Sequence, residues 1–196
     1  KLGVFNLVTL DGYFAGAAGD ISWHKVGPDF QKLAERNSTA GNTLLFGRVT
    51  YELMASYWPT PAARRSDPVV ASGMNASPKV VFSRTLTEAA WENTRLVRGD
   101  MLAEVRRLKR GSGRQLTVLG SGSLVAQLAQ AGLVDEYQLL LVPVALGRGR
   151  TLFEGVDRRL RFSLVSARRF SGGNLLLTYK PAGKSRTAPR RPCVLE

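Results

Sequence analysis

Apolar and polar positions follow two patterns along the first two thirds of the chain. Short apolar runs are typical of buried strands, while apolar residues recurring every three or four positions are typical of one face of a helix. The apolar runs predict strands over 2–9, 43–47, 79–83, 94–99 and 114–120. The helical spacing predicts helices over 28–37, 48–57, 100–110 and 123–132.

The pattern changes after residue 132. Three strand-like runs follow, at 135–146, 160–170 and 173–180, with no helix of comparable length between them. Alternating strands and helices favour a mainly parallel sheet covered by helices, and a closing run of strands favours antiparallel strands added at one edge. The chain is therefore expected to adopt an α/β fold with an antiparallel C-terminal edge.

Local signals mark where several of these elements begin and end. Asp100 is the expected N-cap of the third helix, and Gly132 is the expected stop of the fourth. Small residues gather at 10–25 and prolines at 58–68, so both segments are expected to be loops. Residues 69–77 are expected to hold one or two helical turns.

Length and composition suit one globular domain. The chain has 196 residues, of which 44% are hydrophobic and 22% charged. We expect this domain over residues 1–180 and a basic, flexible tail over 181–196. The single cysteine, Cys193, favours a reducing, cytoplasmic setting. We expect no signal peptide at the start of this sequence, and no membrane partner, because no apolar run approaches the roughly 20 residues that span a bilayer.

The net charge of +13 first suggests nucleic acid as a partner. The basic residues are scattered in pairs such as Arg64-Arg65 and Arg106-Arg107, and no basic helix has interleaved aromatic residues. We therefore expect no nucleic-acid partner. A basic surface also suits a small, phosphate-rich ligand, because electrostatic steering acts over a long range.

Several kinds of catalysis lack the residues they need. His24 is the only histidine, and nothing around it resembles the nucleophile turn of a Ser-His-Asp hydrolase. One histidine and one cysteine do not make a usual zinc site, so we expect no metal. His24 is either a loop residue beside Trp23 or a ligand contact. With so few nucleophiles, chemistry supplied by a bound cofactor becomes more plausible.

Two strand ends carry residues suited to phosphate. Gly47, Arg48 and Thr50 follow the strand at 43–47 and combine close backbone approach, a fixed cation and a hydroxyl. Ser83 and Arg84 end the strand at 79–83, where they would suit a ribose 2′-phosphate. Each junction is also compatible with an ordinary polar turn.

A third strand end reads Gly120-Ser121-Gly122-Ser123-Leu124. It resembles the start of the dinucleotide fingerprint G-x-G-x-x-G, but the position of the last glycine is Val125, and the stretch falls late in the chain. As a Rossmann motif it fails. It is either a tight turn or a helix start whose free amides bind an anion.

Several segments together resemble the dihydrofolate-reductase-like family. They are VTLDGYFAG, LLFGRVTYE, KVVFSRTL, VLGSGSLVAQLAQAGLVDEYQLLLVPVALGRGRTLF and LLLTYK. More narrowly, they resemble the reductase domain of the bifunctional riboflavin-biosynthesis deaminase/reductase (the RibD C-terminal type), over roughly residues 2–180. The resemblance implies a three-layer α/β/α fold with a mixed, mainly parallel sheet of about eight strands. It also implies an NADPH-dependent reductase and suggests a homodimer.

The resemblance also assigns roles to the strand-end residues. Cofactor phosphates are expected at Gly47, Arg48 and Thr50, and the 2′-phosphate at Ser83 and Arg84. The pyrophosphate and the nicotinamide side are expected at Gly120, Ser121, Gly122, Ser123 and Leu124. The loop from Val8 to Gly16 is expected to close over the nicotinamide.

Two carboxylates are candidates for the proton donor that such a reduction needs. Asp29 lies near the place where dihydrofolate reductases carry a carboxylate early in the first helix, but an aspartate there also suits the helix dipole. Asp11 lies in a Leu-Asp-Gly turn, which it also suits structurally.

The substrate stays open at this stage. The sequence given has no counterpart of the zinc-binding deaminase part of the bifunctional enzyme. Its substrate is therefore not expected to be restricted to the 5-amino-6-(5-phosphoribosylamino)uracil intermediate. A pyrimidine- or pterin-like heterocycle is expected. The alternatives are a dihydrofolate or pteridine reductase, and a non-catalytic NADP-binding module.

Overall fold

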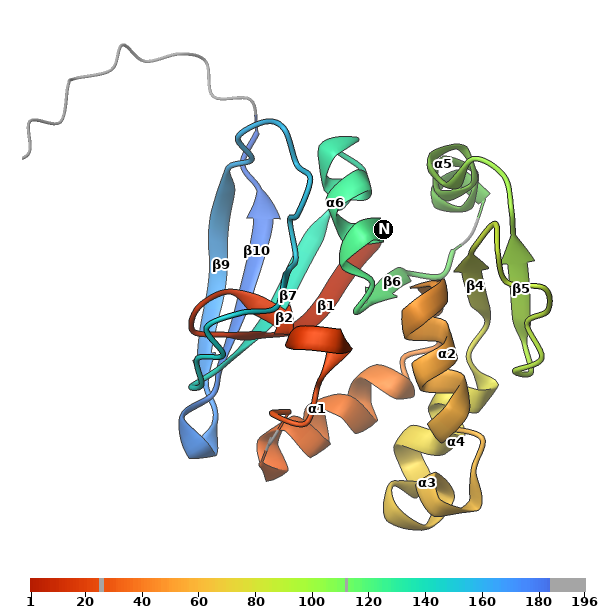
Figure 1. Ribbon diagram of the computed structural model, residues 1–196, viewed down its shortest axis with the longest axis horizontal. Helices are drawn as coiled ribbons and strands as arrows, with labels where there is room; N and C mark the ends of the chain where they lie inside the picture. Colours follow the sequence, from red (N-terminus) through yellow and green to blue (C-terminus); the bar gives the residue numbers. More distant parts are fainter. Residues whose placement is uncertain (25–26, 112, 184–196) are drawn as a thin grey trace, which may run out of the picture.

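The computed structural model describes residues 1–24, 27–111 and 113–183. An eight-stranded sheet runs through it in the order β5-β4-β3-β6-β1-β7-β10-β9 (Figure 1). Its strands are β1 (Leu2–Thr9), β3 (Thr43–Gly47), β4 (Lys79–Phe82), β5 (Thr94–Val97), β6 (Leu116–Leu119), β7 (Glu136–Val142), β9 (Phe162–Arg169) and β10 (Leu175–Pro181). The strands from β5 to β7 are parallel, whereas β10 runs antiparallel to both β7 and β9.

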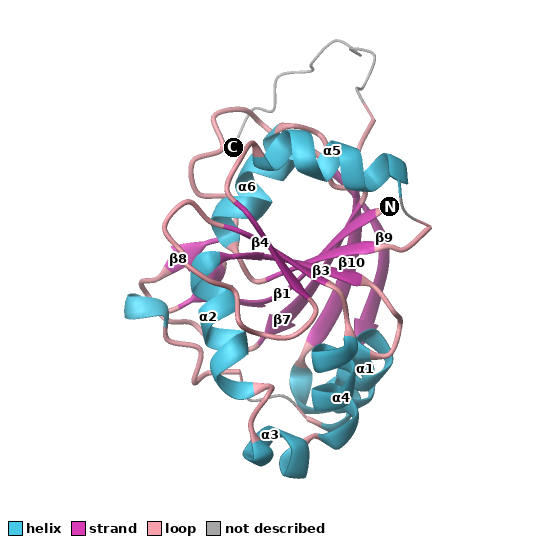
Figure 2. Ribbon diagram, turned by 90° about the vertical axis from the view of Figure 1, so that its right-hand side faces the viewer, coloured by secondary structure: helices cyan, strands magenta, loops and turns pink. Residues whose placement is uncertain are grey.

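Helices cover both faces of this sheet. They are α1 (Pro28–Ser38), α2 (Arg48–Tyr57), α3 (Pro61–Ser66), α4 (Pro68–Ala76), α5 (Met101–Gly111) and α6 (Gly122–Gln130). Figure 2 shows α5 and α6 above the sheet and α1, α3 and α4 below it. The predicted α/β fold, with three layers and an antiparallel C-terminal edge, is confirmed.

The alternation of side chains along the central strands explains the layers. In β3, Leu45 packs in the cluster that includes α5 and α6, while Leu44 and Phe46 pack in the cluster that includes α2 and α4. Successive strand residues point to opposite faces, so an uninterrupted apolar strand needs cover on both. Burial of both faces holds the parallel strands in a fixed register and aligns their carboxyl ends.

The expected loop at 58–68 is wrong, because α3 lies within it. Pro61 occupies the first helical turn, where proline fits, and the Thr60 side chain accepts a hydrogen bond from the Ala63 amide. Pro68 likewise opens α4, a single helix where one or two turns were expected. Prolines here begin helices rather than interrupt them.

Other boundaries follow the sequence signals more closely. Asp100 Oδ1 accepts hydrogen bonds from the second and third residues after it, as an N-cap does. Gly132 ends α6 with a φ of 66°. The expected loop at 10–25 contains a short strand, β2 (Tyr13–Ala15), which pairs with β8 (Arg150–Thr151). Most of the predicted tail, residues 184–196, lies outside the described residues.

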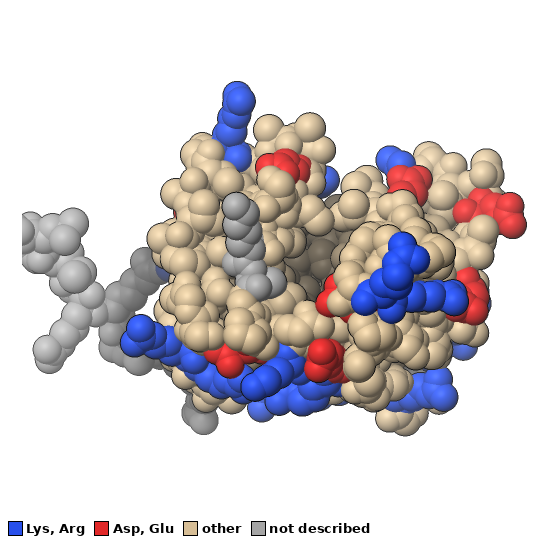
Figure 3. All heavy atoms as spheres, turned by 90° about the horizontal axis from the view of Figure 1, so that it is seen from below, with Lys and Arg blue, Asp and Glu red and all other residues tan. Residues whose placement is uncertain are grey.

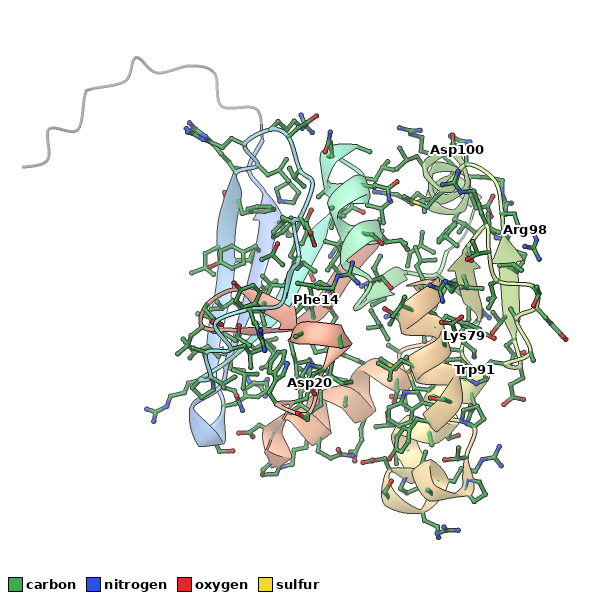
Figure 4. All side chains as sticks on the ribbon, in the orientation of Figure 1. Phe14, Asp20, Lys79, Trp91, Arg98 and Asp100 are labelled. Carbon is green, nitrogen blue, oxygen red and sulfur yellow. The ribbon has the colours of Figure 1, made fainter. Side chains whose placement is uncertain are left out.

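A buried lysine closes the C-terminal end of α4. Lys79 is 1% exposed, and its ammonium donates hydrogen bonds of 2.8, 3.0 and 2.7 Å to the carbonyls of Met74, Asn75 and Ser77. It also lies 4.4 Å from the centre of the Trp91 ring, and Figure 4 labels both residues. Burial lowers the pKa of Lys79 to about 8. The lysine thus satisfies carbonyls that the end of α4 leaves free and fixes the start of β4.

Candidate functional site

The carboxyl ends of the parallel strands border a cavity of about 1200 Å³. Ligands of open α/β sheets bind at this edge. Figure 3 shows one face of the molecule hollowed near its centre, with basic side chains gathered along a border of that face. The predicted cofactor-binding residues that line the cavity are Gly47, Arg48, Thr50, Ser83, Arg84, Gly120, Ser121, Gly122, Ser123 and Leu124. Three separate strand ends therefore contribute to one wall.

Two of these turns are held together by hydrogen bonds. The Gly47 amide donates to Ser121 Oγ over 2.9 Å, and the Ser121 amide donates to Thr50 Oγ1 over 3.0 Å. Each hydroxyl acts as the acceptor here and keeps its own hydrogen, so it can still donate to an anion. The residues predicted as phosphate contacts thus also hold the turn after β3 against the turn after β6.

The start of α6 faces the cavity in an unusual backbone conformation. Gly120 and Ser121 have φ angles of 56° and 54°, so two successive residues are left-handed before the helix begins. This conformation is unfavourable for serine, and such strain is frequent at ligand sites. The side chain of Ser121 does not cap α6. Amides at the start of a helix that lack a side-chain cap can bind an anion.

The turns after β4 and β5 form the far end of the cavity. Ser83 Oγ accepts hydrogen bonds from the amides of Thr85 and Leu86, over 3.2 and 2.9 Å, and closes the turn that presents the exposed Arg84. Arg98 lines the same cavity and donates to a backbone carbonyl over 2.8 Å. Figure 4 shows Arg98 and Asp100 where α5 begins. This end of the cavity is cationic.

Val8 and Asp11 do not line the cavity. Val8 is buried within β1. Asp11 accepts hydrogen bonds from the Thr9 hydroxyl over 2.5 Å and from the amides of Leu146 and Gly147 over 2.9 and 2.8 Å. These bonds, that from Thr9 first, lower the pKa of the Asp11 carboxyl. The carboxylate thus fastens the loop after β1 to the segment after β7.

Asp29 also points to a distant loop rather than to the cavity. Its Oδ2 accepts hydrogen bonds from the hydroxyl and the amide of Ser171, over 2.6 and 2.7 Å. The Ser171 hydroxyl and then its amide lower the pKa of the Asp29 carboxyl. Neither predicted proton donor is placed at the cavity wall, and both carboxylates are favoured in the ionised form.

The other half of the cavity is mainly apolar, and sequence reasoning missed it. Its wall comes from β1, α1, the end of α2 and the loop after β1, and it includes Phe5, Leu7, Phe30, Leu53 and Trp58. Its polar residues include Asn6, His24, Ser56 and Tyr57. Asn6 is 4% exposed and donates from Nδ2 to the Gly120 carbonyl over 3.3 Å. Asn6, a polar residue inside an apolar strand, was a signal for this half that the sequence analysis did not use, and His24 was considered only as a possible ligand contact.

Two further features are absent from the described ranges. No group of three or more His, Cys, Asp or Glu residues is placed there to hold a metal ion. Among the same residues, no helix is long and apolar enough to cross a membrane.

The fold and the cavity define a class: α/β proteins with the dihydrofolate reductase topology and a cavity at the carboxyl edge of the sheet. Residues 1–176 match the family model of the RibD C-terminal domain, and the chain belongs to this family. It is 32% identical over 173 residues to the "Uncharacterized protein YyaP" of Bacillus subtilis (strain 168), covering 88% of this chain and 90% of that one.

Two solved structures are similar in fold. Dihydrofolate reductase from Enterococcus faecalis, complexed with NADP(H) and RAB-propyl, has a TM-score of 0.65 and 17% identity, with 93% of this chain and 96% of that chain covered. A diaminohydroxyphosphoribosylaminopyrimidine deaminase/5-amino-6-(5-phosphoribosylamino)uracil reductase from Thermotoga maritima has a TM-score of 0.65 and 18% identity, with 92% and 56% covered. These two likenesses show the fold, and the family membership rests on the match to the RibD C-terminal domain model.

Proposed function

We propose that this chain is an NADPH-dependent reductase that transfers a hydride to a pyrimidine- or pterin-like heterocycle. The observation that carries the proposal is the convergence of three strand-end turns on one cavity whose other half is aromatic. The turns offer hydroxyls, backbone amides and guanidinium groups, which suit phosphates. The aromatic half suits a flat ring.

The residues present fit NADPH in size and charge. Arg84 and the Ser83 turn would hold the 2′-phosphate, and Arg98 adds a second cation at that end. The start of α6 and Thr50 would hold the pyrophosphate. Arg48 lines the same wall and forms an ion pair of 2.8 Å with Glu52, which orients its guanidinium. The similarity to a dihydrofolate reductase solved with NADP(H) supports this assignment.

The work of the protein in this proposal is positioning. NADPH supplies the hydride when bound. The chain binds the cofactor along the strand ends, orients its reactive end towards the aromatic half, and keeps bulk water from the reacting atoms. Bracing the turn after β3 against the turn after β6 keeps this geometry fixed, since both turns face the same ligand.

The test is NADPH oxidation in the presence of candidate substrates. We expect faster oxidation with 5-amino-6-(5-phosphoribosylamino)uracil or dihydrofolate than without substrate. NADPH binding without oxidation by any pyrimidine or pteridine would instead indicate a non-catalytic NADP-binding module.

The cofactor assignment has its own variant. Arg84→Ala should reduce the preference for NADPH over NADH about tenfold or more, because a hydrogen bond to a charged group is worth about 1.5–3 kcal/mol. Arg65→Ala, which removes an exposed arginine on α3, is the matched control and should leave the preference unchanged. An unchanged preference in Arg84→Ala would remove Arg84 from the 2′-phosphate site.

A further inference from the structure

The cationic end of the cavity also has an apolar wall. Phe82 at the end of β4, Val97 at the end of β5 and Met101 at the start of α5 all line the cavity. Phe82 is 9% exposed, and Val97 and Met101 pack against the same core cluster. Arg84 and Arg98 line the same end. An apolar wall beside two cations suits the flat base of a nucleotide whose phosphate the cations hold.

A carboxylate stands among these cations. Asp100 is the only carboxylate among the described residues that line the cavity, and no lysine or arginine of the described residues forms an ion pair with it. Arg98, two residues earlier, instead donates from Nη2 to the Thr87 carbonyl over 2.8 Å. Figure 4 labels Arg98 and Asp100 where α5 begins. A negative charge beside bound phosphates weakens their binding, so its presence needs a further reason.

Asp100 caps α5, but capping does not require its charge. Its Oδ1 accepts hydrogen bonds from the amides of Leu102 and Ala103, over 2.8 and 3.1 Å. Serine, threonine or asparagine at an N-cap makes such bonds without a charge. Both bonds end on the same oxygen, and no described residue donates to Oδ2. The cap therefore fixes the side chain and leaves Oδ2 as a free acceptor.

We propose that Asp100 is the specificity-determining residue for the base of the nucleotide cofactor. Its Oδ2 accepts a hydrogen bond from the exocyclic amino group of a purine that lies against Phe82, Val97 and Met101. The base selected is then adenine rather than hypoxanthine, which carries an oxo group at that position and would set one acceptor against another. This inference rests on the proposed function, because it gives the cationic end of the cavity to the adenosine part of NADPH.

A matched pair of nucleotides tests the selection. NADPH and its deamino analogue share their phosphates, sugars and nicotinamide, but the analogue carries hypoxanthine in place of adenine. In calorimetric titrations of the full chain, we expect NADPH to bind about tenfold more tightly, the order expected for a hydrogen bond to a charged group. Hypoxanthine also carries a ring N–H next to its oxo group. Equal affinity would mean that the carboxylate accepts from either base, and it would overturn the inference.

Asp100→Asn separates recognition of the base from capping. Asparagine caps a helix about as well as aspartate. With the side-chain oxygen kept by the α5 amides, the amide nitrogen, which is a donor, takes the place of the free oxygen. The variant should therefore bind the deamino analogue at least as tightly as NADPH, and the affinity ratio should change about tenfold. Loss of the negative charge acts on both nucleotides alike and cancels in this ratio.

Asp157→Asn is the matched control, because Asp157 is exposed and does not line the cavity. It should keep the wild-type ratio of the two affinities. Thermal unfolding of Asp100→Asn should give a midpoint close to that of the wild type, which reports that the cap of α5 is intact. A role of Asp100 limited to capping, or to the dipole of α5, would leave the affinity ratio unchanged.

The outcomes distinguish this inference from the proposed function. If the wild-type chain does not bind NADPH, the proposed function fails and this inference fails with it. If NADPH binds but the deamino analogue binds equally well, or if Asp100→Asn keeps the wild-type ratio, the inference alone is overturned and Asp100 only caps α5.

Discussion

Replacement of Gly120 by alanine tests whether the turn after β6 is built for a ligand. Gly120 has a φ of 56°, and a Cβ at this position would lie 3.0 Å from Thr50 Cγ2 and 3.2 Å from Thr50 Oγ1. The substitution therefore acts in two ways. It forces a side chain into the left-handed region, and it displaces the hydroxyl that accepts the Ser121 amide.

The magnitude of the two effects can be estimated separately. A left-handed conformation costs about 1–2 kcal/mol for a residue with a Cβ. Weakening one hydrogen bond adds about 1 kcal/mol. Gly120→Ala should therefore lower the free energy of unfolding by about 2–3 kcal/mol. Displacement of the turn should also lower the affinity for NADPH about tenfold, which corresponds to about 1.4 kcal/mol of binding free energy.

Gly132→Ala is the matched control at the other end of α6. Gly132 has a φ of 66°, but a Cβ there meets nothing within 4 Å. This variant should lose about 1–2 kcal/mol of stability from backbone strain alone and should bind NADPH as the wild type does. Urea unfolding measures the first quantity and calorimetric titration the second. The reasoning would be refuted if Gly120→Ala bound NADPH as tightly as the wild type, or if both variants lost the same amount of stability and of NADPH affinity.

Three further predictions follow from other parts of the molecule. Lys79→Met should lower the free energy of unfolding by about 3–5 kcal/mol in urea unfolding, because three carbonyls at the end of α4 lose their donor. The control Lys32→Met, on the exposed side of α1, should change the free energy of unfolding by less than about 0.5 kcal/mol. Stability should fall as the pH drops from 6.5 towards 4, because the unfolded chain protonates His24 before the folded chain does, and His24→Gln should remove this part of a pH series of unfolding curves. If the chain forms the expected homodimer, the edge strand β9 offers an exposed apolar surface for it, because Leu164 and Val165 are 56% and 52% exposed. Light scattering should then find the double variant Leu164→Glu/Val165→Glu monomeric where the wild type is a dimer formed through β9. A loss below about 1 kcal/mol in Lys79→Met, unchanged pH dependence in His24→Gln, or a dimer that persists in the double variant would contradict the respective prediction.

The parts of the site that follow from local pattern were predictable from the sequence. Gly47, Ser83 and Gly120 each end an apolar run, and parallel strands bring their carboxyl ends to one edge of the sheet. The turns therefore converge without any knowledge of tertiary contacts. The same local reasoning failed at Pro61 and Pro68, because proline marks both the interruption of one helix and the start of another.

The parts that depend on contacts between distant segments were not predictable. Asp11 and Asp29 have local surroundings that suit a proton donor as well as a turn or a helix start. Besides the nearby Thr9, the partners of Asp11 lie 135 and 136 residues away, and the partner of Asp29 lies 142 residues away. His24 lies in a segment without periodicity, so only the folded loop shows that it reaches the cavity wall. The aromatic half is invisible for the same reason, since Phe5 and Phe30 come from separate elements.

The central claim is that the strand ends of β3, β4 and β6 together bind NADPH. Calorimetric titration of the full chain with NADPH and, in parallel, with NADH tests it most directly. The account predicts NADPH binding in the micromolar range, about −8 kcal/mol, and NADH binding at least about tenfold weaker. Absence of NADPH binding up to millimolar concentration, or equal affinity for the two cofactors, would contradict it.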